Sequence, residues 1–151
     1  MICTIFEMNA EINRIKTVLN IEGRSPADTL VLTSKECTVR YPGSTVWQDG
    51  EGCFHYLLVD EARGTVCERV NSRDPYDVLY KVAEGYVFPM AMDYELAHRV
   101  ANRDTRRLLF KKLLELMGRL GPEYERRERA SLDDTLRTHP FDDSLYRFVR
   151  P

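Results

Sequence analysis

Residues 53–70 read CFHYLLVDEARGTVCERV, and this stretch decides the fold. Two runs rich in β-branched and aromatic residues, 53–60 and 65–70, flank a turn over residues 61–64, in which Gly64 can adopt a positive φ. Phe54, Tyr56 and Leu58 lie on one face of the first run and His55, Leu57 and Val59 on the other, so both faces are fairly apolar. We therefore predict a β-hairpin whose first strand lies in the middle of a sheet and is covered on both sides.

The residues before the hairpin predict one helix followed by short strands. Apolar residues recur at helical spacing over residues 9–22, with Asn9 as the N-cap and Gly23 as the C-terminal stop. The stretches that follow are rich in β-branched and apolar residues, which favour strands. Three short strands are predicted, at residues 29–33, 38–41 and 44–48.

After the hairpin the hydrophobic period changes to that of helices. We predict a helix that starts at Asp74-Pro75 and is interrupted at Gly85 and Pro89. Further helices are predicted over residues 90–101, 104–120 and 122–138. The order indicates an α+β domain spanning residues 1–151: an N-terminal helix, a small antiparallel sheet of four or five strands, then three or four helices packed on the sheet.

Length and charge fit one ordinary globular domain. The chain has 151 residues, with 22 Lys and Arg against 24 Asp and Glu, and a formal net charge of −2. A dedicated nucleic-acid-binding protein usually carries a basic excess, which this chain lacks. The first twenty residues have no basic n-region, and no segment reaches the apolar length of a membrane span. We therefore expect a cytoplasmic protein.

The sequence contains no pattern that indicates an enzyme, a metal or a cofactor. The four cysteines form no CxxC pair, and buried free thiols in a reducing compartment are the simplest interpretation. Cys53 and His55 share one face of a strand, but two ligands do not make a metal site. Glu95 and His98 share a helix face, where a solvated pair is the simpler explanation. A hydrolase built on Cys53 and a histidine is a weaker alternative.

Several segments after residue 70 form an ordered set of motifs. They are DPYDVLY (74–80), FPMAMDYEL (88–96), DTRRLLF (104–110), LLELMG (113–118), GPEY (121–124) and HPFDD (139–143). Together with the hairpin, this set resembles a family of small immunity proteins from bacterial polymorphic-toxin and contact-dependent growth-inhibition systems. The resemblance covers residues 53–143.

The resemblance implies a binding protein rather than an enzyme. Such a protein stays in the cytoplasm of the producing cell and blocks the C-terminal toxin domain of a cognate effector. Toxins of these systems are often basic nucleases, so an acidic inhibitor surface would suit both steering and specificity. We therefore predict direct binding and neutralisation of one cognate toxin domain, with no membrane and no direct nucleic-acid contact.

Acidic loop residues are the candidates for the toxin contact. Residues 49–84 hold eight acids and four bases. Trp47 borders a glycine-rich turn, where it would either anchor an interface or fill the core, and the core is the more ordinary place for the chain's one indole. The predicted contact set is Trp47, Asp49, Glu51, Asp60 and Glu61.

Motif residues that family members share are expected to fix the fold, because each immunity protein must discriminate its own toxin. We expect Asp93 to form an ion pair with Arg106 or Arg107 across consecutive helices, and residues 139–141 to dock the tail. The structural set is Asp93, Arg106, Arg107, Phe110, His139 and Phe141.

A basic stretch at residues 103–112 leaves an alternative function open. Arg103, Arg107 and Lys111 follow one another at four-residue steps on the expected helix, so they can contact phosphates. Ordinary solvated charge gives the same pattern, and Lys111 has Glu115 one turn further on. The alternative is a regulatory adaptor or nucleic-acid-binding module that uses this helix.

Overall fold

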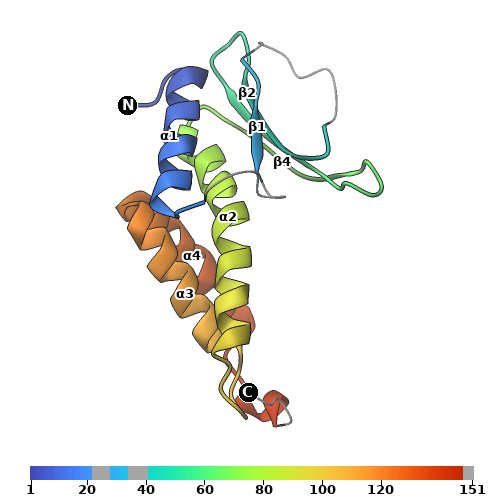
Figure 1. The fold of residues 1–151 in the computed structure, drawn as a ribbon, viewed down its shortest axis with the longest axis vertical. Coiled ribbons are helices and arrows are strands. Elements are labelled where there is room, and N and C mark those ends of the chain that lie inside the picture. The colour runs from blue at the N-terminus through green and yellow to red at the C-terminus, as the bar shows by residue number, and fades with distance from the viewer. Residues whose placement is uncertain (22–27, 34–40, 148–151) are drawn as a thin grey trace. The chain divides into compact units, whose positions relative to one another are not determined.

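A computed structural model describes residues 1–21, 28–33 and 41–147 (Figure 1). The α+β class that we predicted is confirmed, and the chain forms two compact units, Met1–Tyr86 and Val87–Pro151. Of the predicted strand at 38–41, residues 38–40 lie outside the described residues. The elements in chain order are α1 (Ile5–Val18), β1 (Thr29–Val31), β2 (Gly43–Gln48), β3 (Phe54–Val59), β4 (Val66–Ser72), α2 (Pro75–Ala97), α3 (Arg106–Leu120), α4 (Pro122–Thr138) and the 3₁₀ helix η1 (Asp143–Tyr146).

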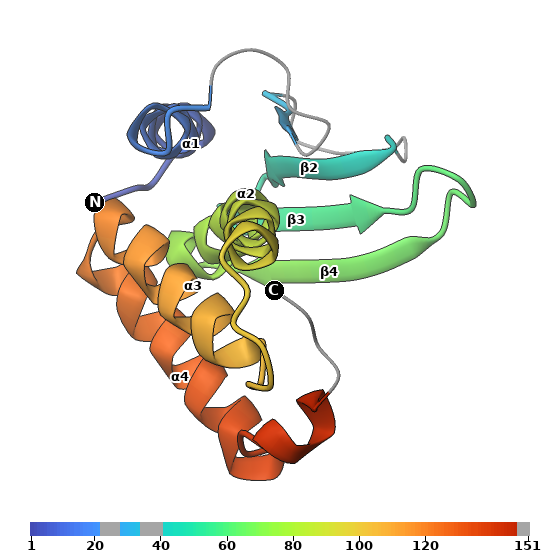
Figure 2. The same cartoon turned by 60° about the horizontal axis from the view of Figure 1, so that its bottom comes forward.

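The first unit contains a four-stranded sheet in the order β1-β2-β3-β4. β3 pairs antiparallel with both neighbours, so the predicted hairpin and the central position of its first strand are confirmed (Figure 2). Phe54, Tyr56, Leu57 and Val59 are buried, so β3 is covered on both faces. Gly64 has a φ of 64° in the turn between β3 and β4, a value that favours glycine.

β1 differs from the antiparallel arrangement that we predicted. It pairs in parallel with β2, with Thr29 opposite Ser44 and Val31 opposite Val46. A parallel neighbour needs a connection of about a dozen residues rather than a tight turn. The stretch 32–42 is long enough for such a connection, but the strand pattern does not reveal the direction of pairing. The sheet is therefore mixed.

α1 begins earlier than the sequence pattern suggested. The hydroxyl of Thr4 accepts the backbone N–H of Glu7 at 3.2 Å, and the Glu7 carboxylate accepts the backbone N–H of Thr4 at 2.9 Å. This reciprocal capping box fixes the start of the helix, so the predicted N-cap at Asn9 is wrong. The helix buries a stripe at helical spacing, formed by Ile5, Met8, Ile12 and Ile15.

Polar side chains attach both ends of α1 within the first unit. Near its start, Gln48 of β2 accepts the backbone N–H of Ile5 at 3.0 Å and donates to the carbonyl of Cys3 at 2.8 Å. Near its end, the Lys16 ammonium binds both carboxylate oxygens of Asp28, at 3.0 and 2.9 Å. The position of α1 beside the sheet is therefore fixed by hydrogen bonds as well as by apolar packing.

Asp28 also binds two further elements of the first unit. Its carboxylate accepts the hydroxyl of Tyr86 in α2 at 2.8 Å and the backbone N–H of Thr29 in β1 at 2.9 Å. Burial alone would raise the pKa of Asp28, but the bonds from Lys16 and Tyr86 outweigh it and lower the pKa. Asp28 is therefore ionised at neutral pH.

α2 is continuous, and the interruption that we predicted at Gly85 and Pro89 is wrong. Pro89 lacks the N–H that would bind the carbonyl of Gly85, so the helix loses one internal hydrogen bond there. Apolar side chains before and after this point are buried, including Val82 and Ala91. Packing of the apolar face therefore outweighs the local preference of the two helix-breaking residues.

The second unit is built on α3 and α4, which lie side by side (Figure 1). Gly121, with a φ of 141°, is the single residue between them, and Pro122 is the first residue of α4. This agrees with the predicted helix boundary at Gly121-Pro122. The buried apolar residues of the pair are Leu113, Leu116, Met117, Leu120, Tyr124 and Leu132.

Asp104 joins the start of α3 to the segment that follows α4. Its carboxylate, in a residue only 1% exposed, binds the Arg106 guanidinium at 2.7 and 3.1 Å and accepts the backbone N–H of Asp142 at 3.0 Å. Arg106 in turn donates to the carbonyls of His139 and Pro140, both at 2.9 Å. The segment after α4 is therefore held against the start of α3.

Arg107 and two aromatic rings complete this attachment. The Arg107 guanidinium lies 4.6 Å from the ring centroid of Phe141, whose ring lies 5.8 Å from that of Phe110. Arg107 also binds the Asp143 carboxylate at 3.0 Å. Cation–π, aromatic and ionic contacts therefore meet at residues 141–143, after α4.

The partner that we predicted for the two arginines is wrong. Asp93 is exposed on α2, whereas Arg106 binds Asp104 and Arg107 binds Asp143. Asp104 precedes Arg106 by only two residues, so the turn before α3 brings the two side chains together with little additional ordering of the chain.

We expect Asp104→Asn to lower the free energy of unfolding by about 3 kcal/mol, because it leaves the Arg106 guanidinium without its buried partner. Asp93→Asn, the matched control on an exposed position, should change it by less than about 0.5 kcal/mol. Urea unfolding followed by circular dichroism measures both. Equal effects of the two substitutions would contradict the assignment.

Acid should remove the same stabilisation in the unmodified protein. Burial alone would raise the pKa of Asp104, but the bonds from Arg106 and from the backbone of Asp142 hold that pKa at about 2. Because this value lies below the ordinary 3.8, the pair stabilises the fold above pH 4 and loses its effect as the pH falls towards 2. Unfolding free energies across this window should drop by about 2 kcal/mol more in the wild type than in Asp104→Asn.

Candidate functional site

The acidic residues predicted for the partner contact lie at opposite ends of β3. Asp49 and Glu51 belong to the turn from β2 to β3, whereas Asp60 and Glu61 begin the turn from β3 to β4. A strand of six residues separates the two turns by about 20 Å. The predicted contact set therefore forms two patches rather than one.

Asp49 organises the first of these turns. Its Oδ1 accepts the backbone N–H groups of Glu51 and Cys53, both at 2.9 Å, and its Oδ2 lies 2.7 Å from Nε2 of His55. The bond to His55, followed by the one from the Cys53 backbone, lowers the pKa of Asp49. Glu51 is exposed at the tip of the turn. Asp49 is thus a structural residue, and Glu51 is the acid that the turn presents to solvent.

His55 is fixed from three directions. Its ring stacks on Trp47 with centroids 4.9 Å apart and planes 6° from parallel, and its Nδ1 lies 2.7 Å from Oδ1 of Asn71 on β4. Trp47 is only 7% exposed and packs with Leu57 and Val59. The indole therefore lies in the core, where it supports the imidazole and offers little surface to a partner.

The second turn, like the first, contains one acid that binds the backbone and one acid that is exposed. Oδ1 of Asp60 accepts the backbone N–H groups of Ala62 at 2.9 Å and Arg63 at 2.7 Å, which fixes the turn that Gly64 closes. Glu61 is exposed. Asp60 is therefore the structural acid of this turn, and Glu61 the presented one.

Glu61 also borders a cavity of about 240 Å³, named the Glu61 cavity here. Tyr56, Leu58 and Val59 of β3 form an apolar part of its wall. The space beside Gly85 on α2 is open, with no atom within 4 Å of where a side chain would begin. The residues that line the cavity are Gly43, Ser44, Tyr56, Leu58, Val59, Glu61 and Gly85.

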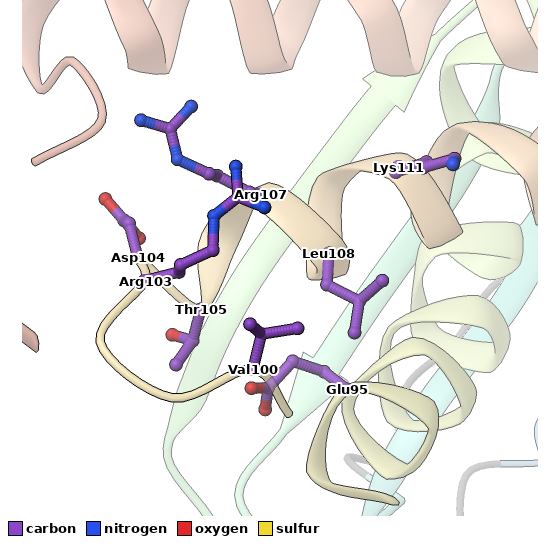
Figure 3. A pocket seen from close by; sticks show the side chains of 8 residues that line it. All are labelled: Glu95, Val100, Arg103, Asp104, Thr105, Arg107, Leu108 and Lys111. Carbon is purple, nitrogen blue, oxygen red and sulfur yellow. The ribbon is translucent and has the colours of Figure 1, made fainter. Parts of the chain in front are cut away.

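A second cavity, of about 200 Å³, lies in the second unit and is named the cationic cavity here (Figure 3). Val100, Leu108 and Glu95 gather on one side of it, and Arg103 and Arg107 on the other. Its lining residues are Glu95, Val100, Arg103, Asp104, Thr105, Arg107, Leu108 and Lys111.

Carboxylates of the chain neutralise much of the predicted basic stretch. Arg106 binds Asp104, Arg107 binds Asp143 and Lys112 binds Glu115 at 3.1 Å. Among the described residues, Arg103 and Lys111 are exposed and form no ion pair, although the charge of Arg103 contributes to the lowered pKa of Asp143.

Two minor sequence candidates have local explanations. Glu95 is buried and binds Arg99 at 2.8 and 2.9 Å, while His98 stacks on Tyr94 at 4.1 Å, so the predicted Glu95–His98 pair does not form a unit. Burial and the charge of Asp49 raise the pKa of Cys53, which disfavours the thiolate that a hydrolase nucleophile needs.

The expectation that the free thiols are buried is wrong for two of them. Cys3 and Cys67 are exposed, and Cys53 is half-buried. Cys37 lies outside the described residues. The alternation of β4 places Cys67 on its more exposed side, which the composition of the strand does not indicate.

Sequence reasoning missed two residues beside Cys53 and His55. Asp49 completes a group of three possible metal ligands with them, and Asn71 binds the second ring nitrogen. Asp49 and Cys53 are four residues apart, a separation that fits a tight turn. The sequence alone could therefore have indicated that their side chains lie close together. Asn71 becomes a neighbour only through the register of β3 with β4, in which it lies opposite His55.

The family model described as Immunity protein 63 matches residues 51–134, more than half of the chain, and the chain belongs to this family. Comparison with curated proteins and with solved structures gives no match.

Membership of this family identifies an immunity protein of polymorphic toxin systems, which acts as an inhibitor of a cognate toxin and not as an enzyme. The match begins at Glu51, so it includes Asp60 and Glu61 but neither Trp47 nor Asp49. Within the described ranges, α2 is the longest helix, yet neither it nor any other combines the length and apolar content of a membrane span.

Substitutions of the two acids of the second turn should have different effects on the free energy of unfolding. Asp60→Ala removes two hydrogen bonds from the turn, so we expect it to lower the free energy of unfolding by about 1 kcal/mol. Glu61→Ala should change it by less than about 0.5 kcal/mol. Urea unfolding of the matched pair measures the difference, and a larger loss for Glu61→Ala would reverse the assignment of their roles.

Proposed function

We propose that this immunity protein neutralises one cognate toxin domain by direct contact centred on Glu61 and the Glu61 cavity. The toxin is a nuclease with a basic surface, and the contact forms in the cytoplasm of the producing bacterium. The observation that carries the proposal is an exposed carboxylate at the edge of a cavity with an apolar wall.

The Glu61 cavity suits a lysine or arginine side chain of the partner. Such a side chain can pack its methylene groups on Leu58 and Val59 while its charge meets the Glu61 carboxylate. A cationic residue enclosed in this way is typical of the few positions that contribute most of the binding energy at an interface.

The electrostatic surroundings favour the same occupant. Burial, followed by the charges of Glu68 and Glu84, raises the pKa of Tyr56 in the cavity wall. Lys81 pairs with both glutamates at 2.6 and 3.1 Å, so Glu61 is the carboxylate of the cavity lining that remains for a cation of the partner. An acidic surface of this kind accelerates association with a basic toxin and disfavours acidic partners.

Glu51 provides a matched comparison for Glu61. It is an exposed acid at the tip of a β-turn, like Glu61, but it does not line either of the two cavities. A charge reversal at Glu51 changes the net charge of the protein by the same amount at the other end of β3. The pair therefore separates a local contact from a general effect of charge.

We expect Glu61→Lys to weaken toxin binding at least about thirtyfold and to abolish protection, because it places a cation where the partner's cation binds. Glu51→Lys should change the affinity less than about threefold. The full chain is co-expressed with the toxin domain encoded beside it, survivors are counted, and affinity is measured by isothermal titration calorimetry.

The opposite ranking of the two variants would move the contact to the turn between β2 and β3. If neither variant weakens binding, the acidic turns are not the contact, and Arg103→Glu with Lys111→Glu then tests the cationic cavity. Unchanged thermal midpoints of the variants exclude unfolding as the cause.

The nucleic-acid alternative depends on the cationic cavity, where Arg103 and Lys111 are the exposed cations. Two cations give only a weak dependence of binding on salt, whereas dedicated binders neutralise many phosphates. We therefore expect no binding of generic DNA or RNA at physiological salt. Tight binding that falls steeply across a salt series would favour the alternative instead.

A further inference from the structure

Three different kinds of metal-binding side chain converge on the turn between β2 and β3. A carboxylate oxygen of Asp49, Sγ of Cys53 and a ring nitrogen of His55 all lie within 4.8 Å of one another, and all three residues are half-buried. Two backbone N–H bonds to Oδ1 already fix the Asp49 carboxylate. The three ligand groups are therefore placed before any ion arrives.

The hydrogen bonds of His55 leave one ring nitrogen facing a carboxylate. Asn71 presents its carbonyl oxygen to Nδ1 at 2.7 Å, which places the ring proton on Nδ1. Nε2, the other ring nitrogen, lies 2.7 Å from Oδ2 of Asp49. Two electron-rich atoms this close need a proton or a cation between them, so the site attracts positive charge.

We propose that Asp49, Cys53 and His55 form a binding site for a zinc-type divalent transition metal, with the fourth position open to water or to a partner side chain. A mixed set of one thiolate, one imidazole and one carboxylate suits zinc better than magnesium or calcium, which prefer oxygen alone. The thiol of Cys53 loses its proton to solvent when the metal binds.

The geometry needs only a small adjustment to close around an ion. Ligand bonds of 2.0–2.2 Å in a tetrahedron set the nitrogen and oxygen atoms about 3.3 Å apart, so the His55–Asp49 contact must open slightly. Sγ of Cys53 lies within 4.8 Å of the other two ligand atoms, and the longer zinc–sulfur bond, about 2.3 Å, sets a thiolate somewhat further from the nitrogen and oxygen ligands than these lie from each other. The contact with Asn71 and the stacking on Trp47 hold the imidazole in place, as outer contacts do at established metal sites.

The fluorescence of Trp47 can be used to follow metal binding at this site. Trp47 is the only tryptophan of the chain and lies directly against the His55 ring. Titration of the reduced full chain with Co²⁺ should give one equivalent of binding, visible bands of four-coordinate cobalt, a thiolate charge-transfer band and a parallel change in Trp47 fluorescence. Zn²⁺ should displace the cobalt.

Matched variants assign the ligands. Cys53→Ser should abolish the thiolate band and weaken binding at least about tenfold, whereas Cys67→Ser, which removes an exposed thiol, should change neither. Asp49→Asn should weaken binding while Glu51→Gln does not. Asn71→Ala should weaken it about 10- to 100-fold through the orientation of His55. Thermal midpoints of the metal-free variants identify any loss that is due to unfolding.

Absence of saturable binding at micromolar Co²⁺ and Zn²⁺ would overturn the proposal, as would a thiolate band that survives Cys53→Ser or disappears with Cys67→Ser. The site is independent of the toxin contact proposed at Glu61. Glu61→Lys should retain full metal binding, so failure of either proposal is recognised separately from failure of the other.

Discussion

The carboxylate of Asp28 is the interaction on which the first unit depends. It binds Lys16 of α1, the start of β1 and Tyr86 of α2, three elements that are distant in sequence. β1 is only three residues long, so its own ladder contributes little, and a hydroxyl contact of 2.8 Å between Thr29 and Ser44 supplements it. Burial raises the pKa of Tyr86 to about 12, so its hydroxyl remains a donor to Asp28 at neutral pH.

The central strand determines where function can lie in the first unit. β3 pairs on both sides and is buried on both faces, so its ends rather than its faces are available for binding. At one end Asp49 contacts His55, whose ring stacks on Trp47. At the other end Glu61 borders the Glu61 cavity. The strand therefore separates two sites of different chemistry.

Features set by neighbouring residues could be predicted from sequence, whereas those set by tertiary packing could not. The hairpin and the boundary at Gly121 follow from local period and turn chemistry. The unbroken course of α2 through Pro89 does not, because buried side chains outweigh the local preference. The position of Asp49, Glu51, Asp60 and Glu61 in turns could also be predicted. Their division between two ends of β3, and the place of Asn71 beside His55, depend on strand register.

In both turns one acid shapes the backbone while the next acid faces solvent. The carboxylates of Asp49 and Asp60 accept the backbone N–H groups that fix the two turns. The carboxylates of Glu51 and Glu61 take no part in these bonds. Substitutions at the two glutamates can therefore accumulate without loss of the fold. With the proposed contact centred on Glu61, this arrangement lets the recognition residue change between related inhibitors while the scaffold is inherited intact.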